Sequence, residues 1–356
     1  MTTSKELMKT IAKEHGADLA TVGGVDYVDV PRIPTGIFAV DLAMGGGFPQ
    51  GKCSIVYGPE SSNKTNIVLL AVVQAQRMWP DKMVVFVDAE HALDLKWAAR
   101  LGVDVKRVIL IHPEYAEQAV DMIESFLYAT DVCMVVLDSI AALTTANELK
   151  NSAETAVVGG ASLTVGKLYR KVPVSYNKMK NQGIIGPAFI AINQIRSKIG
   201  VMYGNPETMP GGNPPKFASA MTVRVYGKNV MEKKISSVMP AFKEVNVIIQ
   251  KWKCPILSVN AVYTMQMVDG GGKQVGFISD WNTVSAYMKE LDYLSKGEKA
   301  GWVMNGQPFK TLEECREVLY GDPDMLADMK ASIIGELIAK GTSLEATGEL
   351  PSEEEA

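Results

Sequence analysis

The segment from Gly58 to Thr65 combines residue types and spacing that can hold the phosphates of a nucleotide. It reads Gly58, Pro59, Glu60, Ser61, Ser62, Asn63, Lys64 and Thr65. The pattern G-x-x-x-x-G-K-[ST] between a strand and a helix is typical of loops whose backbone N–H groups bind phosphates. We expect Lys64 to contact the β- and γ-phosphates and Thr65 to bind Mg²⁺. The segment therefore predicts a site for ATP and Mg²⁺.

One residue of this loop departs from the pattern, because Asn63 stands where the second glycine is expected. That glycine commonly takes a positive φ angle, and Asn is among the non-glycine residues that adopt such angles most readily. We therefore expect the loop to form. The substitution becomes a question about the rate of hydrolysis rather than about nucleotide binding.

Four further polar residues end apolar segments that have the character of buried strands, or follow them within two residues. We expect Asp138 to lie near Mg²⁺, with Ser139 beside it, because the carboxyl ends of the strands meet at one edge of the sheet. Glu90 is placed to orient and deprotonate an attacking water, and the Gln194 amide to bind a γ-phosphate and move the loop behind it. Simpler alternatives stay open, since many buried strands end in Asp and a helix dipole alone would stabilise Glu90.

The charge of the chain is unevenly distributed. Its net charge is −4, but residues 160–260 hold 15 Lys and Arg against 3 Asp and Glu, so this segment carries +12 and the remainder −16. A basic middle segment suits a polyanionic partner. A solvated basic surface with acidic neighbours would explain the same count.

Short apolar segments alternate with helical ones from about residue 54 onward. This alternation predicts an α/β fold in which helices cover both faces of a mostly parallel central sheet. The expected strands are 55–57, 83–88, 108–111, 132–138, 188–193, 221–226 and 245–250, and a helix is expected from about 64 to 77.

The ends of the chain differ in composition from this core. We expect a helix and linker at 1–30, the core at 31–270, a small mixed domain at 271–340 and an acidic disordered tail at 341–356. The amino terminus has no apolar signal core and no apolar run is long enough for a bilayer, so we expect a soluble, cytoplasmic protein with no membrane partner. The four Cys and three His are too scattered to indicate a zinc site or a disulfide framework.

Ordered blocks along the chain resemble the bacterial RecA recombinase family. Beyond the phosphate loop they are 86–94, 137–144, 192–208 and 211–213, of which 192–208 (INQIRSKIGVMYGNPET) is the most specific. The similarity covers about residues 30–250, and its departures suggest a divergent member, with a phage origin as a hypothesis. The resemblance implies a RecA-type P-loop ATPase core, an N-terminal helical segment that packs against another protomer, and a small C-terminal α+β domain that binds duplex DNA.

The resemblance also implies roles for single residues of the nucleotide site. Glu90 is similar to the family's water-activating glutamate, and Gln194 to its γ-phosphate sensor. Asp94 and Trp97 fall where the family holds adenine, and Trp97 would either stack on the base or simply pack in the core. The family donates two lysines to ATP from the neighbouring protomer, and Lys234 is the candidate for one of these.

Two segments, near 151–162 and 195–211, match the family's DNA-binding loops. The resemblance assigns DNA contacts to Arg170, Arg196, Lys198, Ile199, Gly211 and Gly212. The basic side chains would meet phosphates, which gives affinity without reading sequence, and Ile199 would lie between base triplets. Lys216 and Phe217 match a contact between protomers that couples ATP to the state of a filament.

These features together predict an ATP-dependent DNA recombinase. We expect a DNA-dependent ATPase that forms helical filaments on single-stranded DNA and exchanges strands with homologous double-stranded DNA in recombination and repair. Single-strand-binding and loader proteins would be further partners. Two alternatives stay open: a filament-forming DNA-binding protein that holds ATP but hydrolyses little of it, which Asn63 motivates, and a hexameric helicase-type motor with the same core.

Overall fold

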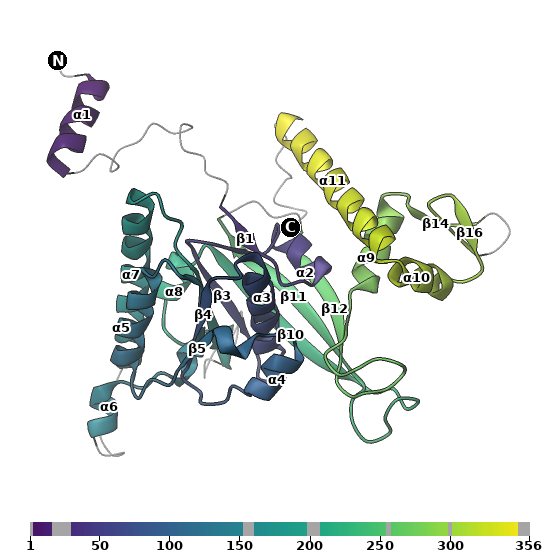
Figure 1. The fold of residues 1–356 in the computed structure, drawn as a ribbon, viewed down its shortest axis with the longest axis horizontal. Helices are drawn as coiled ribbons and strands as arrows, with labels where there is room; N and C mark the ends of the chain where they lie inside the picture. Colours follow the sequence, from purple (N-terminus) through teal and green to yellow (C-terminus); the bar gives the residue numbers. More distant parts are fainter. Residues whose placement is uncertain are drawn as a thin grey trace.

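The computed structural model describes residues 3–15, 30–151, 160–197, 207–253, 258–297 and 301–347, and at its centre is a nine-stranded sheet (Figure 1). The strand order is β13-β12-β11-β10-β3-β7-β6-β4-β5. The strands from β10 to β5 run parallel, whereas β11, β12 and β13 are antiparallel. The predicted α/β fold with a mostly parallel sheet is therefore confirmed. The bounds are β3 (Cys53–Gly58), β4 (Met83–Asp88), β5 (Val108–Ile111), β6 (Val132–Asp138), β7 (Ala188–Gln194), β10 (Met221–Val230), β11 (Phe242–Trp252), β12 (Asn260–Gln266) and β13 (Ile278–Ser279).

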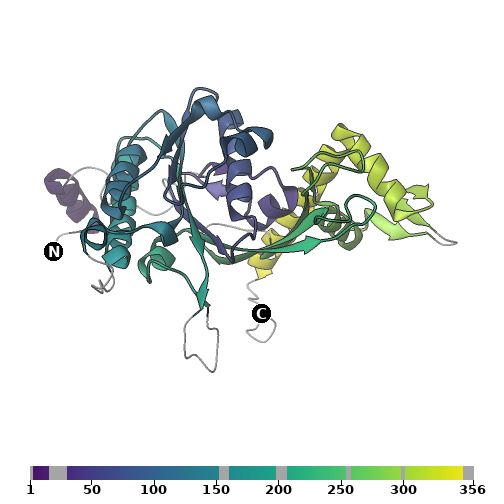
Figure 2. The ribbon, with the colours of Figure 1, turned by 90° about the horizontal axis from the view of Figure 1, so that it is seen from below.

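Helices cover both faces of the parallel strands because these strands are apolar on both sides. All residues of β3 and β6 are buried, as expected of a parallel sheet between two helical layers. One face packs on α3 (Lys64–Met78), and the other on α5 (Ala116–Leu127) and α7 (Gly160–Asn181) (Figures 1 and 2). The strands expected at 83–88, 108–111 and 132–138 agree with the structure to the residue.

The antiparallel strands extend the sheet beyond the pattern that the sequence indicated. Buried and partly buried residues alternate along most of β11, because one face of this strand packs on the core and the other does not. The segment expected at 221–226 is the first part of the longer β10, and the segment expected at 245–250 is the middle of the longer β11. β12 and β13 were not expected, and β13 lies beyond the predicted core boundary at residue 270.

Short elements connect and flank these layers. Within the described ranges, no helix is both long and apolar enough to cross a bilayer. The helix expected near the amino terminus is α1. The shorter elements are α1 (Ser4–His15), β1 (Arg32–Ile33), α2 (Phe38–Ala43), β2 (Phe48–Pro49), α4 (Leu95–Arg100), η1 (Val105–Arg107), η2 (Ile140–Ala142), α6 (Ala146–Lys150), β8 (Arg196–Ser197), β9 (Glu207–Thr208) and α8 (Pro214–Ala218).

The C-terminal elements share an apolar cluster with α2. Phe38 and Leu42 of α2 lie in the same cluster as Val284, Met288 and Ile333. The C-terminal elements therefore pack against the core beside β12, as Figure 1 shows. They are α9 (Trp281–Glu290), β14 (Leu294–Lys296), β15 (Trp302–Met304), β16 (Gln307–Phe309), α10 (Leu312–Gly321) and α11 (Pro323–Thr347). α11 continues past the expected domain end at 340, so the first seven residues of the expected tail are helical, and residues 348–356 lie outside the described part.

Two adjacent isoleucines of α11 test this C-terminal packing. Ile333 is fully buried in the cluster, whereas Ile334 is 37% exposed. We expect Ile333→Ala to lower the free energy of unfolding of the C-terminal region by about 2–5 kcal/mol, because it leaves a cavity. Ile334→Ala should change it by about 0.5 kcal/mol or less. Urea unfolding followed by tryptophan fluorescence measures both, and equal losses would contradict the packing.

Candidate functional site

The residues from Gly58 to Thr65 form a tight loop between β3 and α3. Asn63 has φ 80° and ψ 17°, the left-handed conformation expected of the glycine it replaces, and Ser61 has a φ of 55°. A β-carbon at Gly58 would lie 2.0 Å from the carbonyl oxygen of Val225 on β10, so position 58 admits no side chain. The loop thus closes with asparagine at the unusual position.

Lys64 begins α3 and is buried in the loop. Its Nζ donates a hydrogen bond to the carbonyl oxygen of Pro59 at 2.6 Å. Burial lowers the pKa of Lys64, and the negative charges of Asp138, Glu90 and Glu60 raise it again. A phosphate group would supply further negative charge beside this ammonium, which suits the role expected of Lys64.

Asp138 at the end of β6 is the best candidate for holding a cation. Burial raises the pKa of its carboxyl group to about 6, and Glu90 and Asp88 raise it too, while the hydrogen bond from Thr65 and the charge of Lys64 lower it. Thr65 Oγ1 lies 2.8 Å from Asp138 Oδ2. A cation would offset this concentration of negative charge.

Mg²⁺ fits the donor set at this point. It prefers hard oxygen ligands and is usually held by one or two carboxylates together with substrate phosphates and water. Thr65 and Asp138 supply such oxygens side by side. Within the described ranges, no group of three or more His, Cys, Asp or Glu residues forms a metal site by itself. Phosphate oxygens and water would therefore complete the coordination.

Three of the expected residues meet at the ends of neighbouring strands. Glu90 Oε1 accepts hydrogen bonds from Ser139 Oγ at 2.5 Å and from Gln194 Nε2 at 2.9 Å. The parallel register places Gln194 of β7 opposite Gly58, where the phosphate loop begins. The structure therefore brings the expected water-activating carboxylate and the expected phosphate-sensing amide into direct contact beside the loop.

The expected adenine residues lie at the start of α4. Asp94 caps this helix, since its Oδ1 accepts from the backbone N–H groups of Lys96 and Trp97 at 2.8 and 3.1 Å. Trp97 is partly buried, and its Nε1 donates to Asn66 Oδ1 at 2.7 Å. This hydrogen bond connects Trp97 to α3, the helix that directly follows the phosphate loop.

Sequence reasoning missed the residues of β11 and β12 that brace the phosphate loop. Lys243 of β11 is 9% exposed, and its Nζ donates to the carbonyl oxygen of Ser61 at 2.7 Å. Burial lowers the pKa of this amine. Asn63 Nδ2 donates to Tyr263 Oη of β12 at 3.0 Å. No motif marks Lys243 or Tyr263, because both contacts depend on the pairing of the antiparallel strands.

Both ends of the expected DNA loop at 195–211 are held beside β7. β8 pairs with β9 across the base of this loop, and Asn193 Nδ2 donates to the carbonyl oxygen of Pro210 at 2.9 Å. Gly211 and Gly212 have φ angles of 92° and 73°, a region that glycine adopts without strain. These two glycines therefore also have a conformational role at the end of the loop.

The structure places only some of the expected DNA-contacting side chains. Arg170 on α7 and Arg196 on β8 are both exposed. Lys198 and Ile199 lie outside the described residues, as do residues 152–159 of the other expected loop.

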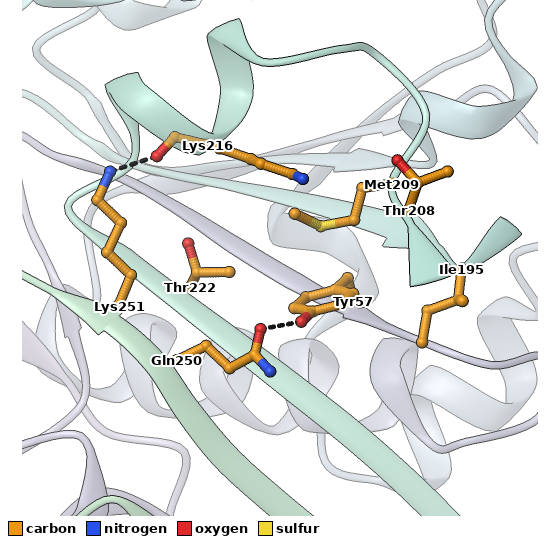
Figure 3. Close-up of a pocket in the computed structure, with 8 residues that line it drawn as sticks. All are labelled: Tyr57, Ile195, Thr208, Met209, Lys216, Thr222, Gln250 and Lys251. Atoms are coloured by element: carbon orange, nitrogen blue, oxygen red, sulfur yellow. Dashed lines mark hydrogen bonds between the residues drawn. The ribbon is translucent and has the colours of Figure 1, made fainter. Parts of the chain in front are cut away.

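A cavity of about 290 Å³ lies between the base of this loop, α8 and the sheet (Figure 3). Figure 3 shows Lys216 reaching over it from α8 and Tyr57, which precedes the phosphate loop, facing it. Tyr57 donates a hydrogen bond to Gln250 there. Phe217, the next residue of α8, is 73% exposed. Lys216 and Phe217, the expected interface residues, thus lie beside a cavity that is also lined by Tyr57 of β3, the strand that leads to the phosphate loop. Its lining residues are Tyr57, Ile195, Thr208, Met209, Lys216, Thr222, Gln250 and Lys251.

Lys234 lies in the turn between β10 and β11. Its backbone N–H donates to Glu232 Oε1 at 3.3 Å, and its side chain is exposed. That exposure is what a residue acting on a neighbouring protomer requires.

The fold and this site define a class of protein. A phosphate loop between a parallel strand and a helix, a Thr65–Asp138 pair for Mg²⁺, and polar residues at the ends of adjacent strands are the features of a P-loop nucleotide-binding protein. Residues 3–268 match the family model described as "RecA N-terminal domain". The chain therefore belongs to the RecA family.

Individual RecA proteins agree with this family. A protein RecA of Petrotoga mobilis is 36% identical over 259 residues, 68% of each chain. A protein RecA of Aquifex aeolicus is 43% identical over 202 residues, 56% of each chain, and one of Nautilia profundicola is 39% identical over 67% of this chain and 65% of its own. The crystal structure of the RadB recombinase superposes with a TM-score of 0.47 and 17% identity, over 66% of this chain and 96% of that one.

Lys243 offers a test of how the phosphate loop is braced. Lys243→Met should weaken ATP binding by about tenfold or more, because a hydrogen bond from a charged donor contributes roughly 1.5–3 kcal/mol. Isothermal titration calorimetry with Mg²⁺·ATP, in the absence of DNA, measures the change. Lys251→Met is the matched control, since Lys251 is on the same strand and donates to backbone carbonyls of α8 instead. Equal effects of the two substitutions would refute a specific role for Lys243.

Proposed function

We propose that this chain is an ATP-dependent DNA recombinase that forms helical filaments on single-stranded DNA and exchanges strands with homologous duplex DNA. The observation that carries the proposal is the hydrogen bond from Gln194 to Glu90. Gln194 ends β7 beside the phosphate loop and directly precedes the expected DNA loop at 195–211. One residue therefore joins the site of hydrolysis to the site of DNA binding, and membership of the RecA family supports both roles.

The arrangement of the strand-end residues supports a role in ATP hydrolysis. The backbone of the loop from Gly58 to Thr65 and the ammonium group of Lys64 bind the phosphates. Thr65 and Asp138 would hold Mg²⁺, which would neutralise charge on the phosphates. Glu90 takes a proton from the attacking water, and its carboxylate is held in place by Ser139 and Gln194.

The γ-phosphate acts on the DNA loop through Gln194. A γ-phosphate oxygen is a second acceptor for the Gln194 amide and competes with Glu90 for it. A shift of this side chain moves the end of β7, where Asn193 holds Pro210 at the far end of the loop. Binding and loss of the γ-phosphate thereby change how the loop meets DNA.

DNA binding and self-association use the exposed residues. Arg170 and Arg196, with Lys198, Ile199, Gly211 and Gly212, contact single-stranded DNA mainly through its phosphates. Lys216 and the exposed Phe217 contact the next protomer, as does α1, and Lys234 reaches the ATP bound there. The C-terminal elements bind the duplex, and single-strand-binding and loader proteins assist in the cytoplasm.

Strand exchange tests the function as a whole. Purified protein should convert single-stranded circles and homologous linear duplex into joint molecules only when ATP and Mg²⁺ are present. The absence of joint molecules across salt concentrations, with and without a single-strand-binding protein, would reject the proposal.

Glu90→Gln should lower DNA-stimulated ATP hydrolysis by about a hundredfold or more, because it removes a general base.

The same variant separates catalysis from binding. Glu90→Gln should retain binding to single-stranded DNA, because Glu90 has no proposed contact with DNA and glutamine keeps a side-chain oxygen that can accept the hydrogen bond from Gln194. Glu114→Gln makes the same change at another exposed carboxylate, after β5, and should hydrolyse ATP at the wild-type rate. Equal hydrolysis by wild type and Glu90→Gln would refute the role given to Glu90.

Arg196 tests the DNA surface. Arg196→Ala should reduce the slope of log affinity against log salt concentration by about 0.7, the value expected for one lost phosphate contact on single-stranded DNA. The loss should be similar for all DNA sequences, because phosphates carry no sequence information. Fluorescence anisotropy over a range of salt concentrations measures it. Lys106→Ala, an exposed cation beside β5, should leave the slope unchanged.

A further inference from the structure

Asn63 is the middle of a chain of side-chain hydrogen bonds that crosses the nucleotide site. Trp97 Nε1 donates to Asn66 Oδ1 at 2.7 Å, and Asn66 Nδ2 donates to Asn63 Oδ1 at 2.6 Å. Asn63 Nδ2 in turn donates to Tyr263 Oη at 3.0 Å and approaches Met265 Sδ at 3.2 Å. The chain therefore runs from α4 through α3 and the phosphate loop to β12.

The burial and the donor–acceptor matching of these groups give the hydrogen-bond network one arrangement. Asn63 is 8% exposed and Tyr263 is 1% exposed, so water has little access to the central bonds. The acceptor of Asn63 faces a donor of Asn66, and its donor faces the tyrosine oxygen, which fixes the orientation of both amides. Glycine at position 63 has no side chain and would leave Asn66 and Tyr263 without this partner.

We propose that Asn63 is a positioning residue that couples the phosphate loop to the base site. This inference rests on the proposed binding of ATP at the loop, with adenine at Trp97. Through Asn66, Asn63 holds the indole of Trp97 in one orientation before the nucleotide arrives. Binding a base against an already ordered Trp97 ring costs less side-chain entropy than binding that must first order the ring. The network therefore favours ligands that carry a base.

The test compares two ligands that share the phosphates but differ in the base. Calorimetry is performed with Mg²⁺·ATP and with Mg²⁺·tripolyphosphate, which has no base or ribose. Asn63→Gly should weaken ATP binding by about threefold to tenfold, the range of one net hydrogen bond. Tripolyphosphate binding should change by about twofold or less. An equal loss for both ligands, or no loss for ATP, would overturn the proposal.

A double-mutant cycle locates the effect at Trp97. Trp97→Phe keeps an aromatic ring but removes the N–H that reaches Asn66. In this background Asn63→Gly should change ATP affinity by about twofold or less, the limit expected once the connection is cut. The same threefold to tenfold loss in both backgrounds would show that Asn63 acts on the loop alone. Asn66→Ala breaks the hydrogen-bond chain between Asn63 and Trp97. It should therefore give the same result as Asn63→Gly: weaker ATP binding with Trp97, and little change with Phe at position 97.

Ser61→Gly is the matched control for backbone freedom. Ser61 also has a positive φ in the same loop, but its side chain is exposed and lies outside the network. Its effect on ATP affinity should be the same with Trp97 or Phe at position 97.

A wild-type protein that fails to bind ATP would reject the nucleotide site itself. Normal ATP binding without joint molecules would reject the recombinase function and leave the coupling to be judged by the cycle.

Discussion

The parallel pairing of β3 with β7 is the constraint on which the site depends. It sets Gly58, where the phosphate loop starts, opposite Gln194, where the second expected DNA loop starts. β6 and β4 follow in the same direction, so Asp138 and Glu90 reach the same edge of the sheet. Residues separated by more than a hundred positions in the chain thereby meet at one edge of the sheet. Helices on both faces keep this register, because any slip would move the buried side chains of these strands out of the apolar layers.

Much of this arrangement was predictable from the sequence because it depends on local signals. Buried parallel strands are short and continuously apolar, which is why 83–88 and 132–138 agree with the structure to the residue. Asp138, which ends one of these strands, and Glu90, two residues after the other, stand out against the apolar runs. The left-handed conformation of Asn63 was also foreseeable, since the loop pattern requires it there and asparagine tolerates it.

The features that escaped prediction depend on contacts between distant strands. Lys243 reaches Ser61 across 182 positions, and Tyr263 reaches Asn63 across 200. Neither belongs to a motif, and both contacts exist only because β10, β11 and β12 pair in one register. The core boundary at residue 270 was placed at a glycine run, whereas β13 continues the sheet beyond it. A glycine turn between two strands and one between two domains have the same local composition.

The tight approach of β10 to the phosphate loop bears on the history of this chain. At position 58 the carbonyl of Val225 leaves no room for a side chain, whereas position 63 opens toward β12. A lineage can therefore depart from the usual loop pattern at the second glycine but not at the first. An asparagine that arrived before its partners would have buried an unpaired amide, at a cost of about 1–3 kcal/mol. Glycine at position 63 would in turn leave the Tyr263 hydroxyl and the Asn66 amide without this partner, so the three positions are coupled and substitutions at them are expected to occur together.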